Sequence, residues 1–378
     1  MAFARQESEP PETTTREVAP GILRCQLPVS MPGLGHVNAY LLPDDRGACL
    51  VDAGVPGDAS WEALVAGLAG AGLAARDIHT VVVTHSHPDH FGGAHRLAAE
   101  TEAQVVTHGA WQTRWWRAAQ AGGHGGAGGH GGAGGHGGAG EHSGAADGHA
   151  CFDLPDIDPA DLPAVNPWTE PTPWGNESFL ARWVRDMPER GAGDTASAWL
   201  PPEPDRGVGD GEGLVLGGRR WTCLYTPGHT LDHLCLYDPE GGVLLSGDHV
   251  LPTITPHIPG IAGGRDALAS YLSSLDRVAK MAEVSVVLPA HGNPFGDLPG
   301  RVADIQAHHE ARLGRLLEIA TAIGPAGVVA YSHELFREAR WGPMAESEAY
   351  AHLEHLRLDS RLVRRGTGAD MVYEPAQV

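Results

Sequence analysis

An apolar run that leads directly into a dense group of metal-ligand side chains constrains this chain more than any other feature. The stretch VVVTHSHPDH places three valines, predicted as a buried strand, just before His85, His87, Asp89 and His90. Four such side chains within six positions are costly to leave unpaired, so a polar turn that is merely rich in histidine is the weaker interpretation. The stretch therefore predicts a metal site at a strand end.

The same arrangement recurs three times further along the chain. The runs CLYTPGHT, VLLSGDH and VVLPAHG lead from apolar residues to His229, Asp248 and His291. Each of these motifs is weak alone, but functional groups in mixed α/β proteins gather where strands end, so the four places are expected to meet. Seven such residues suit two metal ions that share one carboxylate. Histidine and carboxylate without cysteine favour catalytic zinc, and iron or manganese also suit the set.

The remaining pattern predicts an α/β domain with a long insertion. Residues 1–17 are expected to be a disordered tail, and residues 18–300 alternate predicted strands and helices around residues 111–212. That insertion holds a glycine-rich repeat with histidines six residues apart and seven of the ten tryptophans of the chain. The repeat is interpreted as a flexible linker rather than a metal-buffering tract, while the Trp-rich part is either a lid or a peripheral decoration. Residues 301–378 predict three helices and a hairpin, which matches a winged helix.

The composition of the chain limits the classes of molecule that it is expected to bind. The formal net charge is −21, from 26 basic and 47 acidic side chains, which disfavours nucleic acid as a partner and suits a small molecule. No apolar stretch is long enough to span a membrane, and the first residues hold no signal peptide. Cys49, Cys223 and Cys235 lie in strand-like runs and are expected to be reduced, which predicts a cytoplasmic protein. A homo-oligomer stays open.

The order of the motifs HSHPDH, GHT, GDH and AHG resembles that of the metallo-β-lactamase superfamily. The resemblance covers residues 18–110 and 213–300, and the C-terminal region is similar to the winged helix of one branch of β-lactamase-like hydrolases. It implies a four-layer αββα sandwich with two metals at one edge of the sheets. If the ligand positions of the family apply here, one metal would be bound by His85, His87 and His229, and the second would be bound by Asp89, His90 and His291. Asp248 would bridge the two metals. Asn38 and Asp52 would brace the site loops.

The function implied is a zinc-dependent hydrolase that uses a metal-bridging hydroxide on a small ester, thioester or lactone. Two cations lower the pKa of a shared water to about 7. Asp89 and Asp248 are the expected catalytic residues, with Asp89 a candidate to orient the nucleophile. His249 and His257 could reach the mouth of the site. The other histidines considered, namely His36, His79, His95 and His108, are expected to be structural or exposed.

Two other functions stay open. The first is a metal-dependent endoribonuclease or phosphodiesterase, which the winged-helix branch allows. Residues 301–378 hold arginines but no lysine, acidic residues slightly outnumber the arginines, and only residues 357–365 are locally basic. A winged helix that packs on the core is therefore favoured over one that reads nucleic acid. The second is a metal-dependent oxidoreductase of the sulfur dioxygenase type, which a full set of seven ligands disfavours.

Overall fold

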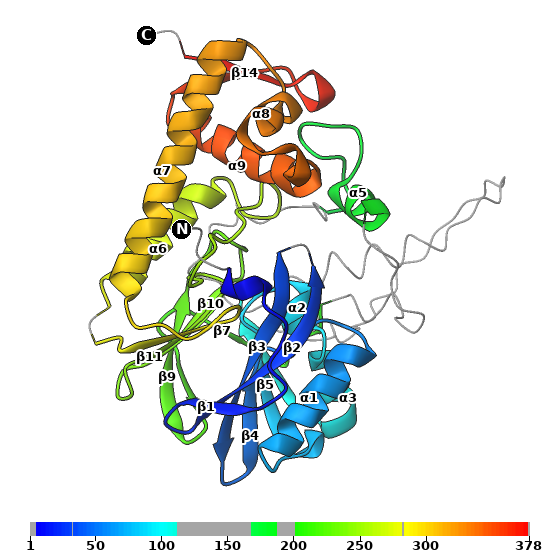
Figure 1. Ribbon diagram of the computed structural model, residues 1–378, viewed down its shortest axis with the longest axis vertical. Coiled ribbons are helices and arrows are strands. Elements are labelled where there is room, and N and C mark those ends of the chain that lie inside the picture. Colours follow the sequence, from blue (N-terminus) through cyan, green and yellow to red (C-terminus); the bar gives the residue numbers. More distant parts are fainter. Residues whose placement is uncertain (1–4, 32, 112–167, 187–200, 282, 377–378) are drawn as a thin grey trace, which may run out of the picture.

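The computed structural model describes residues 5–31, 33–111, 168–186, 201–281 and 283–376. The glycine-rich repeat and most of the predicted insertion lie outside these ranges, and what the sequence predicts for them stays a prediction. Two sheets and a C-terminal helical region make up the described part of the chain (Figure 1).

The first sheet contains seven strands in the described residues, in the spatial order β1 to β7. Antiparallel pairing joins β1 to β4, and parallel pairing joins β4 to β7. Strand β4 holds the buried run Ala-Cys-Leu-Val, and β5 ends in two buried valines, as expected for strands at the centre of a sheet covered on both faces. The strands are β1 (Arg16–Ala19), β2 (Ile22–Met31), β3 (Leu34–Asp44), β4 (Gly47–Val51), β5 (Ile78–Val82), β6 (Gln104–His108) and β7 (Arg206–Val208).

The second sheet has five strands in the described residues, in the order β12-β11-β10-β9-β8. Only β11 and β12 are parallel. Its strands are β8 (Gly213–Leu216), β9 (Arg219–Tyr225), β10 (Leu234–Asp238), β11 (Val243–Gly247) and β12 (Val286–Pro289). The predicted ligand residues lie just beyond the parallel strands β5, β11 and β12 and just beyond the antiparallel strand β9.

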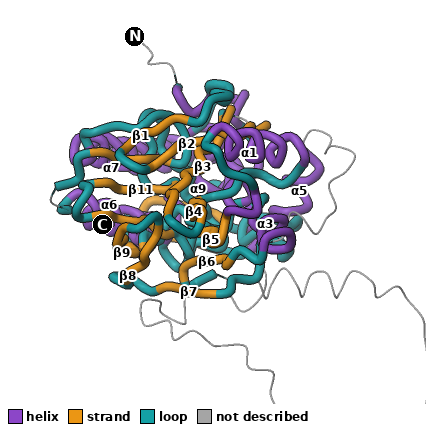
Figure 2. Tube along the Cα trace, turned by 90° about the horizontal axis from the view of Figure 1, so that it is seen from below, coloured by secondary structure: helices purple, strands orange, loops and turns teal. Residues whose placement is uncertain are grey.

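The two sheets pack face to face between two layers of helices. Side chains from both sheets, among them Val82, Trp221 and Leu236, form one buried cluster between them. A second cluster joins the first sheet to α1 (Asp58–Gly70) and α3 (Ala94–Thr101), and a third joins the second sheet to α6 (Ala267–Ala279). Figure 2 shows these helices on opposite sides of the strands. The layers follow because each sheet buries two apolar faces.

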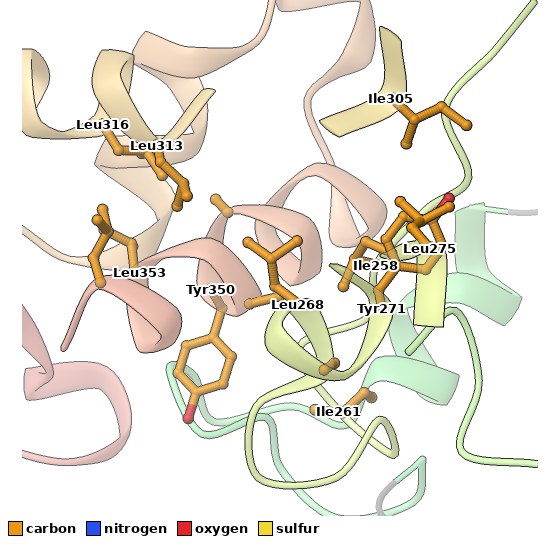
Figure 3. Packing of buried hydrophobic residues seen from close by; sticks show 14 of the residues in the cluster. Ile258, Ile261, Leu268, Tyr271, Leu275, Ile305, Leu313, Leu316, Tyr350 and Leu353 are labelled. Carbon is orange, nitrogen blue, oxygen red and sulfur yellow. The ribbon is translucent and has the colours of Figure 1, made fainter. Parts of the chain in front are cut away.

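The C-terminal region extends the third cluster away from the sheets. It consists of α7 (Leu298–Ile323), α8 (Val328–Leu335), α9 (Pro343–Leu358) and a hairpin of β13 (Leu362–Arg365) and β14 (Val372–Pro375). In Figure 3, Leu268 of α6 lies toward Leu313 of α7 and Leu353 of α9, and Tyr271 of α6 lies beside Ile258. The order of three helices and a hairpin agrees with the expectation, and its apolar core is continuous with that of the second sheet.

Part of the predicted insertion packs on this C-terminal region. Helix α5 (Phe179–Asp186) lies beside α9 (Figure 1), where Arg182 forms an ion pair with the buried Glu346. Trp174 donates a hydrogen bond from Nε1 to the same carboxylate at 3.1 Å and lies against Tyr350. These contacts attach the described part of the insertion to α9.

Two segments make contacts that the predicted boundaries do not anticipate. Residues 5–17 belong to the ordered protein, because Glu7 is fully buried and accepts hydrogen bonds from the N–H groups of Thr253 and Ile254 at 2.8 and 3.1 Å. Strand β7 lies inside the region expected to be an insertion, yet it pairs with β6 as the edge of the first sheet. Both segments are short and polar, so their partners far along the chain leave no local periodic signal. Among the described helices, none is long and apolar enough to cross a bilayer.

An ion pair between α9 and the start of α6 should make stability depend on pH. His355 Nδ1 lies 3.1 Å from Asp266, whose carboxylate also caps α6 at Ala269 N. The hydrogen bond to Asp266 raises the pKa of His355. Burial opposes ionisation of Asp266, but His355 and Ala269 outweigh it and lower the pKa of that carboxyl. The stabilisation is therefore full between the ordinary pKa values, 3.8 for Asp and 6.5 for His, and is lost on either side.

We expect His355→Gln to lower the free energy of unfolding by roughly 1 kcal/mol near pH 5.5, and by much less near pH 9. Urea unfolding of both proteins at the two pH values measures the difference. An equal loss at both values would show that the imidazole acts by packing and not by charge. His333→Gln is the control, because it removes an exposed histidine that is stacked on Trp341 and is not part of this ion pair. Its effect on the free energy of unfolding should differ little between the two pH values.

Candidate metal centre

The loop after β5 carries four of the predicted ligands and is fixed by hydrogen bonds to a buried carboxylate. Asp52 follows β4 and accepts hydrogen bonds from Thr84 N at 2.8 Å and Thr84 Oγ1 at 2.9 Å. It also accepts from His90 Nδ1 at 2.8 Å. Asp52 adopts a left-handed backbone with φ of 60°, a strained conformation that clusters at functional sites. The bracing role expected for Asp52 agrees with these contacts.

A single helical turn presents the last two ligands of this loop. Helix α2 (Pro88–Phe91) begins with a proline, whose fixed φ suits the first helical position, and Asp89 lies in that first turn. His90 follows directly, and both side chains are buried. The turn therefore directs Asp89 and His90 to a different side of the centre from His85 and His87.

The first group of donors consists of three ring nitrogens and one carboxylate. His87 Nδ1 lies 3.0 Å from His85 Nε2 and 3.1 Å from His229 Nε2. Asp248 Oδ2 lies 3.5 Å from His229 Nε2 and 4.0 Å from His85 Nε2. All four donor atoms are within 4.8 Å of one another. Bound to one zinc ion, two ring nitrogens would be about 3.4 Å apart, so the group is close to the size that a cation requires.

The second group lies on the other side of Asp248. Asp89 Oδ2 is 3.4 Å from His291 Nε2 and 3.7 Å from His90 Nε2. Asp248 reaches this group as well, with Oδ1 3.4 Å from His291 Nε2 and Oδ2 3.7 Å from His90 Nε2. The structure thus brings together all seven predicted residues and places Asp248 between the two groups.

Hydrogen bonds at the outer nitrogens determine which nitrogen of each ring faces the centre. His229 Nδ1 donates to the carbonyl oxygen of His257 at 2.8 Å, and His291 Nδ1 donates to that of His36 at 2.6 Å. His90 Nδ1 donates to Asp52. Each contact leaves the Nε2 lone pair directed inward, which is the arrangement that second-shell partners impose on metal-binding histidines.

The inner atoms lack ordinary partners, as a cation site requires. His90 Nε2, His291 Nε2 and Asp248 Oδ1 are buried and make no hydrogen bond of good geometry within the described residues. A buried polar atom without a partner costs about 1–3 kcal/mol, which a bound cation would remove. The donors are imidazoles and carboxylates, so the residues present fit a divalent metal.

The electrostatics of the metal-free centre differ between the two groups. Burial, and then the neighbouring His229, lower the pKa of His87 to about 3, so this ring is neutral and its lone pair is available. Burial also disfavours a charge on His90, but Asp89 and Asp52 outweigh it and raise the pKa of His90 to about 9. Burial opposes ionisation of Asp89 as well, yet His90 and His291 lower its pKa to about 2. Protons on the second group therefore balance its carboxylates, and metal binding must release them.

Other predicted residues have mixed outcomes. Asn38 donates from Nδ2 to the carbonyl oxygens of Pro289 and Gly292, both at 2.8 Å, and so braces the loop that carries His291. His257 reaches the centre through its carbonyl oxygen, not its ring. His249 is buried against Tyr271 and belongs to neither donor group. Of the histidines expected to be structural, His36 holds Gly292 N at 3.1 Å and His108 stacks on Tyr225.

Two supporting residues were missed by the sequence analysis. His233 is fully buried and its Nε2 accepts a hydrogen bond from Asp248 N at 3.1 Å. Asp232, also buried, accepts from Ser86 Oγ at 3.1 Å and holds the loop between His85 and His87. Both lie in the run GHTLDH, directly after a predicted ligand, and this proximity is the signal that could have indicated them.

Comparison with known proteins agrees with this architecture. The model of the metallo-beta-lactamase superfamily matches residues 32–291, more than two thirds of the chain. The chain belongs to the metallo-beta-lactamase superfamily. The predicted superfamily is thus confirmed, and with it a mixed α/β fold that implies divalent metal binding. Metallo-beta-lactamase superfamily proteins are generally metal-dependent hydrolases, although some are oxidoreductases.

Solved structures of the metallo-beta-lactamase family extend the likeness beyond the matched range. A family protein from Thermus thermophilus shares 28% identity and a TM-score of 0.70, covering 95% of this chain and 100% of its own. A beta-lactamase domain protein from Burkholderia ambifaria shares 26% identity and a TM-score of 0.67, covering 97% and 96%. The fold similarity therefore includes the C-terminal region.

Curated relatives match a shorter part of the chain. The lactamase-like protein nscB of Aspergillus fumigatus is 32% identical over 120 residues, 32% of this chain and 34% of its own length. The lactamase-like protein adaB of Aspergillus niger is 32% identical over 108 residues, 29% and 32% of the two chains. This chain thus spans about a third of the length of the curated relatives it matches.

Proposed function

We propose that the protein is a zinc-dependent hydrolase of a small ester, thioester or lactone. The observation that carries this proposal is the convergence of seven imidazole and carboxylate donors from four strand ends. The outer nitrogens of His90, His229 and His291 are already hydrogen-bonded. In such a centre, bound zinc ions would supply Lewis acidity and a water whose pKa is lowered to about 7. The absence of cysteine from both donor groups supports a catalytic centre over a structural one.

The positions of the seven donor residues suggest which metal ion each of them would bind. We propose that His85, His87 and His229 hold one ion and that Asp89, His90 and His291 hold the other. Asp248 lies between both groups and would contact both ions. Asp89 presents a buried carboxylate at the edge of the second group, and we propose that it also orients the attacking water.

We propose that residues 18–300 form the metal-binding domain. Residues 301–378 follow it as a winged helix that packs on the core of this domain and shapes the pocket. The continuous apolar cluster through α6, α7 and α9 supports packing over independent binding. The locally basic stretch is also neutralised within the chain. Arg357 and Arg364 pair with Glu354 at 2.9 and 3.2 Å, and Arg365 pairs with Glu374 at 2.6 Å.

These ion pairs bear on the endoribonuclease alternative. Arginines that already contact carboxylates are poorly placed to neutralise phosphates, and the overall charge of −21 repels a nucleic-acid backbone. Weak RNA binding that does not change with salt would support the small-molecule proposal. Tight binding that falls steeply with salt would favour the ribonuclease.

The oxidoreductase alternative depends on the number of metals. A single-iron centre needs only the first group, whereas the second group of Asp89, His90 and His291 is equally compact. We therefore favour two ions.

The four described cysteines are buried and free, and burial raises the pKa of Cys223 and Cys235 to about 12, which supports a reduced, cytoplasmic protein.

Metal analysis of the purified protein, followed by a substrate panel, tests the proposed function. We expect zinc to be the main metal and hydrolysis to occur within a panel of thioesters, lactones, β-lactams and short RNAs. A chelator should remove the activity, and added Zn²⁺ should restore it. Full hydrolysis by metal-free protein would contradict the proposal, and so would iron content with oxygen consumption in place of hydrolysis.

A further inference from the structure

A second group of ligand-type side chains lies at the far end of the first sheet from the metal centre. Asp44 ends β3, Cys49 lies on β4, and His79 lies near the start of β5, so three neighbouring strands each contribute one residue. Their ligand atoms lie within 4.8 Å of one another. His79 is one of the histidines predicted from the sequence to be structural or exposed.

The backbone is irregular at the residue that completes this group. Ala48 pairs with Ile78 and Cys49 with Thr80, so the register of β4 and β5 shifts at His79, which has no partner in the ladder. An extra residue of this kind redirects a side chain, and such bulges are common beside functional sites. Here the unpaired His79 directs its imidazole to Cys49 on the neighbouring strand.

The thiol and the carboxylate approach the same ring nitrogen. His79 Nε2 lies 3.1 Å from Asp44 Oδ2 and 3.9 Å from Cys49 Sγ, while its Nδ1 lies 3.0 Å from Thr80 Oγ1. A Cys-His-Asp catalytic triad would instead place the thiol and the carboxylate on opposite nitrogens. Three donors that converge on one point fit a shared cation better.

The distances agree with zinc coordination. In a tetrahedral site, a ring nitrogen would lie about 3.4 Å from a carboxylate oxygen and about 3.6 Å from a thiolate sulfur. Both observed separations are within a few tenths of an ångström of these values. Asp44 and His79, though not Cys49, also line a cavity of about 300 Å³ whose wall includes Asp45, Arg46 and Arg206, with room for a water as a further ligand. Asp44 and Asp45 offset the two arginines there.

We propose that Asp44, Cys49 and His79 form a second, separate metal site that binds a zinc-type divalent cation. Thiolate, imidazole and carboxylate together favour Zn²⁺ over Mg²⁺ or Ca²⁺, which prefer oxygen ligands. The site shares no residue with the centre at His85–His291, so it does not depend on the proposed hydrolytic function.

Cobalt titration tests this site by a signal that the other centre cannot produce. Thiolate coordination of Co²⁺ produces a charge-transfer band in the near ultraviolet, and neither donor group of the first centre contains a cysteine. We expect the full-length, reduced protein to develop this band, and His87→Ala to develop it equally. Cys49→Ala should abolish it, and Asp44→Asn and His79→Gln should each weaken Co²⁺ binding at least tenfold.

Cys25→Ala is the matched control, because it also removes a buried, free thiol from the first sheet but has no place in the group. It should keep the band, and circular dichroism should show that each variant is folded. No band in the unmodified protein at saturating Co²⁺, or an undiminished band in Cys49→Ala, would overturn the proposed site. So would unchanged Co²⁺ affinity in both Asp44→Asn and His79→Gln.

Discussion

Replacing Asp248 or His87 by alanine should abolish both metal loading and hydrolysis. Asp248 lies 3.4 to 4.0 Å from ring nitrogens of both groups, so its loss removes the carboxylate between two sets of histidines. His87 contributes the nitrogen that lies closest to both other rings of the first group. Since bound metal is expected to supply several kcal/mol of transition-state stabilisation, kcat/KM should fall on the order of 10³-fold or more.

Asp238→Ala is the matched control for Asp248→Ala. Asp238 is another buried aspartate at a strand end of the second sheet, but it pairs with Arg219 and belongs to neither donor group. Its loss should lower stability and leave metal content and activity in the folded protein unchanged. Elemental analysis and steady-state kinetics on the same samples separate the outcomes. An Asp248→Ala protein that keeps both metals, or full activity, would refute the bridging role.

Replacing Glu348 by glutamine should weaken the fold and the metal centre together. Glu348 of α9 forms an ion pair with Arg312 of α7, and both side chains keep only 15% of their surface exposed. Burial opposes its ionisation, but Arg312 outweighs it and holds the pKa of Glu348 well below its usual range. Loss of the carboxylate leaves Arg312 unpaired in a mostly buried place. We expect the free energy of unfolding to fall by about 3 kcal/mol, the lower end for buried pairs.

The expected loss of zinc affinity follows from the contact between Glu348 and His257. His257 Nδ1 lies 3.5 Å from Glu348 Oε2, and the His257 carbonyl oxygen accepts the hydrogen bond that orients His229. Outer-shell partners of metal ligands typically contribute about 10- to 100-fold to affinity. Glu348 acts through one more residue, so we expect a loss of about tenfold in zinc affinity, measured by competition with a chromophoric chelator.

Glu346→Gln separates this route from general weakening of α9. Glu346 lies on the same helix and also pairs with an arginine, but its partners Arg182 and Trp174 lead to α5 and not to the metal centre. We expect it to lose stability and keep its zinc affinity. If both variants lost zinc affinity to the same extent, Glu348 would have no specific link to His229. The unfolding measurements should use metal-free protein, because bound metal adds to apparent stability.

Much of the fold could be predicted because long elements carry strong periodic patterns. Helices α6 and α7 occur where their apolar residues recur on one face and where Gly324 ends the second helix. Strands β5, β11 and β12 follow from continuous apolar runs. The short polar segments could not be predicted in this way. Glu7 and β7 are placed by partners nearly 250 and 100 residues away, and nothing in their own sequence records those contacts.

The seven donor residues could be identified from the sequence because each follows an apolar run, and strand ends of one sheet edge meet in space. The sequence by itself thus determined the type of chemistry and its superfamily, through residue types and their order. Only the tertiary structure decided which nitrogen of His90, His229 and His291 faces the centre, because their outer hydrogen bonds go to carboxylate and carbonyl oxygens far along the chain. The same reason applies to His233, Glu348 and His79, whose roles depend on partners that no local pattern specifies.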